Sequence, residues 1–297
     1  MSFTSFLLRT AFKRGDDKRD AGLTTPDDIR RYDDIVYGPD RKRQVLDVYR
    51  PKDAEGALPV IVSVHGGGWV YGDKERYQYY CMSLAQHGFA VVNFTYRLAP
   101  KFKFPASLED TDLVFHWVLA HAEEYGFDAA HVFAVGDSAG AHMLGLYSCI
   151  CTDPAFAARF PFRSPESFAP TAVALNCGVY EPVPSGRDLT ARLMADFLPN
   201  KGSADELDRI SVLRHLSSAF PPSFVMTAND DFLREAAPPM AEKLSSLGVP
   251  VVLKQYGDEG NRLSHVFHCN IRTEEAQRCN AEECAFFKGF LPQKERV

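Results

Sequence analysis

The pentapeptide GDSAG at residues 136–140 constrains the fold of this chain more than any other segment. The apolar run 131–135 leads into it, and residues 141–147 follow it with helical character. Ser138 is therefore expected on a sharp turn between a strand and a helix, the context that the G-x-S-x-G pattern requires. Such a turn leaves no room for flanking side chains, which explains the two glycines. The Ser138 hydroxyl would then be exposed above a helix amino terminus, whose free N–H groups favour negative charge. An ordinary glycine-rich turn is the alternative.

A second glycine-rich segment, HGGGW at residues 65–69, follows the continuous apolar run 60–64. Three consecutive glycines after a buried strand carry an entropic cost unless the backbone must approach something closely. Acyl transfer requires such an approach, because two or three preorganised N–H donors stabilise the oxyanion. The predicted donors are the N–H groups of Gly66, Gly67 and Ala139. A flexible loop is the alternative, but the two motifs in this order favour a serine nucleophile that faces an oxyanion hole.

Further motifs occur at residues 96–100 (YRLAP), 104–106 (FPA) and 109–110 (ED). Together with the two glycine-rich segments, they resemble the hormone-sensitive-lipase-like branch of the α/β-hydrolases over about residues 45–290. The resemblance implies an α/β-hydrolase fold and carboxylic-ester hydrolysis through a Ser-Asp-His triad, with no metal and no organic cofactor. One departure is Ala-His at 141–142, where this branch usually has a further glycine. That segment looks closer to arylformamidase-like relatives.

The domain organisation follows from the order of the predicted elements. No Ser/Gly-rich or Pro-rich linker divides the chain, so residues 1–297 are expected to form a single domain. Strands alternate with helical stretches, which predicts a mostly parallel central sheet with helices on both faces. Residues 43–49 alternate in polarity and are expected to form an antiparallel edge strand. Residues 1–35 are expected to be helical, with a helix start at 25–28, and to form a cap with the insertion 178–218. For the N-terminal segment, simple packing on the core is an equal alternative.

The partners of the serine are expected later in the chain, in the order acid and then histidine, each after a strand. Asp230 and Asp231 compete for the role of the acid. The family pattern of Asp, one residue and Leu favours Asp231, whose role is to hold the histidine in the useful tautomer. His265 and His268 compete for the role of the base. His265 ends a polar loop and matches the family's His-x-Phe pattern, so it is the predicted base that activates the serine.

The substrate is less constrained than the chemistry. Trp69, Tyr71, Val179 and Tyr180 are predicted to wall an acyl pocket, although aromatic residues at such positions are as often part of the core. The leading expectation is hydrolysis of small, short-acyl esters of the acetyl type. An arylformamidase-like amide hydrolase is the first alternative. A non-catalytic small-molecule-binding relative is the second, and the presence of all three triad residue types argues against it.

Charge and cysteine content limit the partners. The formal net charge is −6 with acids and bases interspersed, which argues against nucleic acid or an anionic membrane as a partner. No apolar run approaches the roughly 20 residues needed to span a bilayer, and residues 2–10 lack the features of a signal peptide. The seven cysteines are odd in number and show no zinc-site spacing, which predicts a reducing cytoplasm and no metal centre. Relatives are often dimers, so a homodimer is one expected state.

Overall fold

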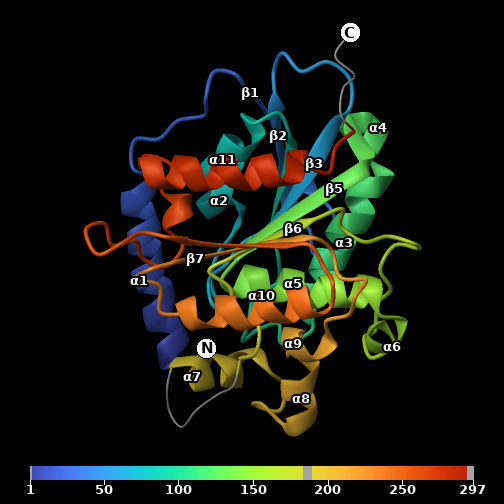
Figure 1. The fold of residues 1–297 in the computed structure, drawn as a ribbon, viewed down its shortest axis with the longest axis vertical. Helices are drawn as coiled ribbons and strands as arrows, with labels where there is room; N and C mark the ends of the chain where they lie inside the picture. The colour runs from blue at the N-terminus through green and yellow to red at the C-terminus, as the bar shows by residue number, and fades with distance from the viewer. Residues whose placement is uncertain (1, 183–188, 293–297) are drawn as a thin grey trace.

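A single eight-stranded sheet organises the chain (Figure 1). The computed structural model describes residues 2–182 and 189–292. The strand order is β1-β2-β4-β3-β5-β6-β7-β8; β2 is antiparallel to both β1 and β4, and the other neighbouring pairs are parallel. The strands are β1 (Ile29–Val36), β2 (Val45–Pro51), β3 (Leu58–Val64), β4 (Ala90–Thr95), β5 (Phe127–Asp137), β6 (Val173–Asn176), β7 (Ser223–Ala228) and β8 (Val251–Tyr256).

Helices cover both faces of this sheet (Figure 1). One face carries α2 (Lys74–Ala85) and α11 (Glu274–Lys288), and the other carries α3 (Ala106–Ala120), α5 (Ala139–Thr152) and α10 (Ala237–Ser246). The short elements are α4 (Ala122–Tyr125), α6 (Pro154–Ala157), and the 3-10 turns η1 (Arg234–Ala236) and η2 (Phe267–Cys269).

The sequence of the central strands explains these two layers. In β3, Val60 and Val62 belong to one buried cluster while Ile61 belongs to the other. Successive side chains of a strand point to opposite faces, so a continuous apolar run suits a strand covered on both sides. The predicted mostly parallel sheet with helices on both faces is confirmed. None of the helices in the described residues has the length and apolar character needed to cross a membrane.

Two predictions for the N-terminal region are wrong. Residues 29–36 form strand β1 rather than a helix, and β2 is therefore an interior strand instead of the edge. The charged side chains Arg30, Asp33 and Asp34 are exposed, which suits an edge strand that must resist pairing with other molecules. Backbone hydrogen bonds to β2 hold this strand in the sheet. Because its side chains are largely polar, the sequence shows no apolar alternation that would predict a strand.

Of the remaining helices, three gather at one end of the molecule, and α1 runs along its side from that end (Figure 1). They are α1 (Phe3–Asp20), α7 (Leu189–Phe197), α8 (Ala204–Arg209) and α9 (Val212–His215). The hydroxyls of Ser2 and Ser5 both donate hydrogen bonds to the Asp196 carboxylate of α7, so the start of α1 lies against α7. Of the predicted cap, residues 29–35 belong to the sheet, and residues 183–188 lie outside the described residues.

Candidate active site

Ser138 occupies a strained turn between β5 and α5. Its backbone angles are φ 53° and ψ −117°, which non-glycine residues rarely adopt. A Cβ on Gly136 would lie 2.7 Å from the Gly140 carbonyl group, and a Cβ on Gly140 would overlap the Val64 carbonyl. The N–H of Ser138 donates to the Asn176 carbonyl at 2.9 Å. The two glycines are thus required by close backbone approach, and the turn is anchored to the neighbouring strand.

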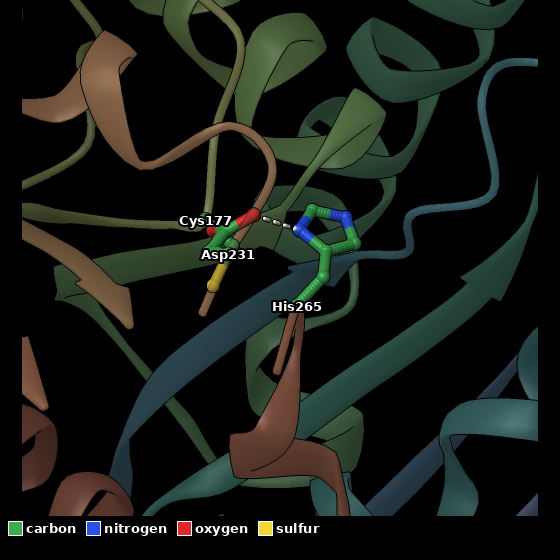
Figure 2. A group of neighbouring side chains, drawn as sticks. All are labelled: Cys177, Asp231 and His265. Atoms are coloured by element: carbon green, nitrogen blue, oxygen red, sulfur yellow. Dashed lines mark hydrogen bonds and ion pairs between the residues drawn. The ribbon is translucent and has the colours of Figure 1, made fainter. Parts of the chain in front are cut away.

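The part-buried His265 and the buried Asp231 form a hydrogen-bonded pair, drawn in Figure 2. The distance from His265 Nδ1 to Asp231 Oδ1 is 2.7 Å, and the other ring nitrogen points away from the carboxylate. Asp231 also accepts hydrogen bonds from the Leu233 N–H at 2.8 Å and the Thr227 hydroxyl at 3.2 Å. Burial acts to raise the pKa of Asp231, but the hydrogen bonds, led by that from His265, lower it overall. The pair is therefore arranged as a carboxylate that orients an imidazole.

Asp230 and His268, the alternatives for the acid and the base, do not belong to this pair. Asp230 is part-exposed and pairs with Arg262 at 2.6 Å. His268 is fully buried, and burial lowers its pKa to about 3. The structure therefore brings Asp231 to His265, and it places neither alternative in that pair.

One cavity of about 280 Å³ collects most of the predicted site residues. Two predicted residues do not line it: Asp231 lies behind His265, and the Tyr180 ring is buried in the core, where its hydroxyl donates to the Leu175 carbonyl at 3.1 Å. Three of the four residues predicted for the pocket wall therefore line the cavity, whereas the chain turns the Tyr180 ring inward. The predicted residues that line the cavity are Gly66, Gly67, Trp69, Tyr71, Ser138, Ala139, Val179 and His265.

The N–H of Gly66 is already used. It donates to the Tyr77 hydroxyl at 3.0 Å and lies 3.2 Å from Asp137 Oδ1, while the Tyr77 hydroxyl donates to Asp137 Oδ2 at 2.8 Å. Among the described residues, the N–H groups of Gly67 and Ala139, together with that of Gly68, have no hydrogen-bond partner. Gly66 therefore supports its own loop, and of the three predicted donors only Gly67 and Ala139 have free N–H groups in the described structure.

Asp137 and Tyr77 are site residues that the sequence analysis did not select. Burial raises the pKa of Asp137 to about 6, and the hydrogen bond from Tyr77, the nearby His265 and the Gly66 N–H act in the opposite direction. Asp137 is thus a second carboxyl group that lines the same cavity as His265. Its position inside the GDSAG motif was the available signal, whereas nothing local marks Tyr77 on α2.

Helix α1 forms the outer wall of the same cavity. Tyr71 donates to Asp16 at 2.7 Å, and Arg9 donates to the carbonyls of Val70 at 2.5 Å and Ala99 at 2.9 Å. These bonds attach the helix to the segment that follows HGGGW. The helix lines the cavity through one face, with residues Ala11, Phe12, Gly15, Asp16 and Arg19.

A potential metal-binding group overlaps this site. Ligand atoms of Cys177, Asp231 and His265 all lie within 4.8 Å of one another (Figure 2). A metal would need the thiolate, yet burial raises the pKa of the Cys177 thiol well above its usual range. Asp231 and His265 are already bonded to each other, and the Cys177 thiol donates to Met226 Sδ at 4.0 Å. The donor set therefore fits a hydrogen-bond network better than a metal centre. The sequence carried no signal for Cys177.

His142 occupies the position that departs from the family pattern. The Trp69 indole N–H donates to His142 Nδ1 at 3.1 Å, and Nε2 lies 2.7 Å from the Ile210 carbonyl. Burial lowers the pKa of His142 to about 4, so the ring is neutral at pH 7, with its single N–H directed to Ile210. The side chain links the HGGGW segment to the segment after α8, and this structural role accounts for its presence.

Comparisons with known proteins agree with this geometry. The BD-FAE family model matches residues 46–233. The chain is 30% identical over 210 residues to the probable carboxylic ester hydrolase LipM of Mycobacterium tuberculosis, covering 67% of this chain and 48% of LipM. It is also 30% identical over 216 residues to an ethyl acetate hydrolase of Pseudomonas putida, covering 69% and 67% of the two chains.

Similarity to a solved structure extends over nearly the whole chain. Esterase B from Lactobacillus rhamnosis, crystallised in an inhibited form, superimposes with a TM-score of 0.87 at 25% identity and covers 97% of both chains. By contrast, the chain spans only 48%, 33% and 56% of the first three curated relatives. The family match, the strand order and the strained serine turn lead to one conclusion: the chain belongs to the BD-FAE family, within the hormone-sensitive-lipase-like branch of the α/β-hydrolases.

Proposed function

We propose that this protein is a serine carboxylesterase. Ser138 is the nucleophile, His265 the general base and acid, and Asp231 the group that orients His265. The observation that carries the proposal is the 2.7 Å contact between His265 and the buried Asp231, beside a cavity that Ser138 also lines. A serine hydroxyl is a weak nucleophile until an adjacent base takes its proton.

The reaction has two halves. The Ser138 oxygen attacks the ester carbonyl carbon while His265 Nε2 takes the hydroxyl proton, and negative charge develops on the carbonyl oxygen. Asp231 stabilises the resulting imidazolium. The bond to the alcohol oxygen then breaks, and His265 gives its proton to that oxygen. A water molecule, deprotonated by the same histidine, attacks the acyl-enzyme and releases the carboxylic acid.

The oxyanion is stabilised by backbone donors. Gly67 and Ala139 supply them, with Gly68 as a neighbouring donor, because these N–H groups are free in the described part of the chain. Gly66 holds the loop in place through Tyr77 and Asp137. Loss of one such donor typically costs about 10²–10³ in turnover.

The substrate is a small, uncharged ester with a short acyl group of the acetyl type. Trp69, Tyr71 and Val179 line the cavity and supply apolar walls, and a relative at 30% identity is an ethyl acetate hydrolase. Helices α1 and α7 act as the cap of a single-domain enzyme. Formamide hydrolysis is less well supported, since His142, the residue that suggested it, is used in packing.

A fluorophosphonate probe tests the proposal. Wild-type protein should be labelled at Ser138 and should hydrolyse p-nitrophenyl acetate much faster than N-formylkynurenine. Ser138→Ala should abolish labelling and hydrolysis with an unchanged circular dichroism spectrum. Ser264→Ala, an exposed serine beside His265, serves as the matched control and should retain both. Near-wild-type turnover by Ser138→Ala would reject the nucleophile assignment.

A further inference from the structure

Phe232 is the most exposed of the large apolar side chains found exposed in the described residues. The residue is 71% exposed, although it lies between the buried Asp231 and the part-buried Leu233. The ring also lines the cavity, and its centroid lies 4.4 Å from that of the His265 imidazole. Single exposed apolar side chains are common on protein surfaces; Phe232 differs because it also lines the cavity and packs against His265.

The chemistry of ester cleavage indicates which half of the substrate, acyl or alcohol, the Phe232 ring contacts. His265 must deliver a proton to the oxygen of the departing alcohol, so the group attached to that oxygen has to pass beside the imidazole. Phe232 packs against the same imidazole. The ring is therefore placed to contact the alcohol group rather than the acyl group.

The surrounding side chains define what this alcohol group can be. Phe12 and Val266 also line the cavity and are apolar. Each charged side chain that the described residues bring to the cavity already has a partner: Arg19 pairs with Asp16 at 2.8 Å, Asp137 accepts from Tyr77, and His265 is held by Asp231. No charge in this described wall is left to bind a charged alcohol.

We propose that Phe232 determines specificity for the alcohol half of the substrate, and that the enzyme prefers esters of aromatic or bulky apolar alcohols. This inference rests on the proposed esterase function. A planar apolar group gains an offset or edge contact with the phenyl ring in addition to burial of its surface. A small alcohol such as ethanol cannot reach the ring in the same way and gains little from it.

The test compares benzyl acetate with ethyl acetate. Both share the acetyl group, and both release a primary alcohol, so the ratio of their kcat/KM values reports the rest of the alcohol group. Phe232→Ala should lower the benzyl-to-ethyl ratio about 10-fold, the size expected when a pocket loses one substantial apolar contact. Phe232→Trp should keep or raise the ratio. Phe6→Ala is the matched control, because Phe6 is 52% exposed on α1 but does not line the cavity.

Each outcome decides the question. An unchanged ratio in Phe232→Ala overturns the inference. An equal loss on both esters also overturns it, because the ring would then only position His265. If wild-type protein hydrolyses neither ester, or if Ser138→Ala still hydrolyses them, the proposed function fails as well. Activity on both esters with an unaltered ratio leaves the esterase proposal standing and removes only the role of Phe232.

Discussion

The two walls of the cavity are built differently. On the sheet side, Gly66, Tyr77 and Asp137 form a buried network at the ends of β3 and β5. On the other side, α1 is attached mainly by side chains, such as Arg9 on backbone carbonyls and Asp17 paired with Arg76 at 2.5 Å near the surface. Buried hydrogen bonds to charged groups contribute about 1.5–3 kcal/mol, whereas exposed ion pairs contribute about 0–1 kcal/mol. The sheet wall therefore holds the reacting groups in position, and substitutions in the helix wall are expected to have smaller effects on activity.

The largest expected effect is on the sheet side, in the acid of the triad. Asp231→Asn should lower kcat for p-nitrophenyl acetate about 10⁴-fold, because the amide favours the wrong tautomer of His265. Asp230→Asn is the matched control on the neighbouring residue and should stay close to wild type, since Asp230 pairs only with Arg262 among the described residues. Equal losses in the two variants would contradict the assignment of the acid.

This contrast also separates what the sequence could predict from what it could not. The strained turn at Ser138 and the close-packed backbone of residues 65–69 were predictable because the constraint is local: a tight turn, or a backbone that must approach closely, selects glycine at fixed spacing. The segments that hold His265 and Asp231 followed from their order after successive strands, and the family's His-x-Phe and Asp-x-Leu patterns selected these residues over His268 and Asp230. Their meeting in space is a property of parallel strands that end at one edge of the sheet.

Contacts between distant segments were not predictable in this way. Tyr77 reaches Gly66 from α2, and the thiol of Cys177 reaches Asp231 from the end of β6. A single sequence contains no spacing rule for such pairs. Strand β1 was missed for a related reason, since an edge strand rich in charge lacks the apolar alternation that identifies a strand.

A second prediction concerns the buried Asp137 of the sheet wall. Its pKa is raised from 3.8 to about 6 by burial, so the folded protein binds its proton more tightly than the unfolded chain. The stability it contributes is therefore full below about pH 4 and is lost as the pH rises to about 6, a total of about 3 kcal/mol. Urea unfolding of wild type and Asp137→Asn should show a difference that declines over this range and is constant above it.

The helix wall supplies the control for that measurement. Asp17 is on the surface of α1, and its pKa is lowered by hydrogen bonds from Lys13 and Arg76. Asp17→Asn should therefore give a small pH dependence of opposite sign. A difference between wild type and Asp137→Asn that does not vary with pH would show that Asp137 is not held in a desolvated environment.

A smaller effect is expected from the support of the oxyanion loop. Tyr77→Phe removes the hydroxyl that links Gly66 to Asp137. Loss of about 1.5 kcal/mol of positioning energy corresponds to a roughly 10-fold lower kcat for ethyl acetate, with little change in KM. Tyr79→Phe is the control from the same helix, because its hydroxyl donates to the Leu23 carbonyl at 2.8 Å. A change confined to KM would place Tyr77 in substrate binding instead.

The smallest expected effect comes from a glycine-to-alanine substitution, made once in the helix wall and once in the sheet wall. Gly15 lies within α1, and a Cβ there would meet nothing within 4 Å. Alanine is the better helix former, so Gly15→Ala should stabilise the protein by about 0.5–1 kcal/mol and leave kcat/KM for ethyl acetate unchanged. At Gly67, φ is +116° and a Cβ would overlap the Tyr71 carbonyl, so Gly67→Ala should lower both the melting temperature and kcat. Thermal unfolding of the two variants measures the difference, and a loss of stability in Gly15→Ala would mean that the helix wall is as tightly constrained as the sheet wall.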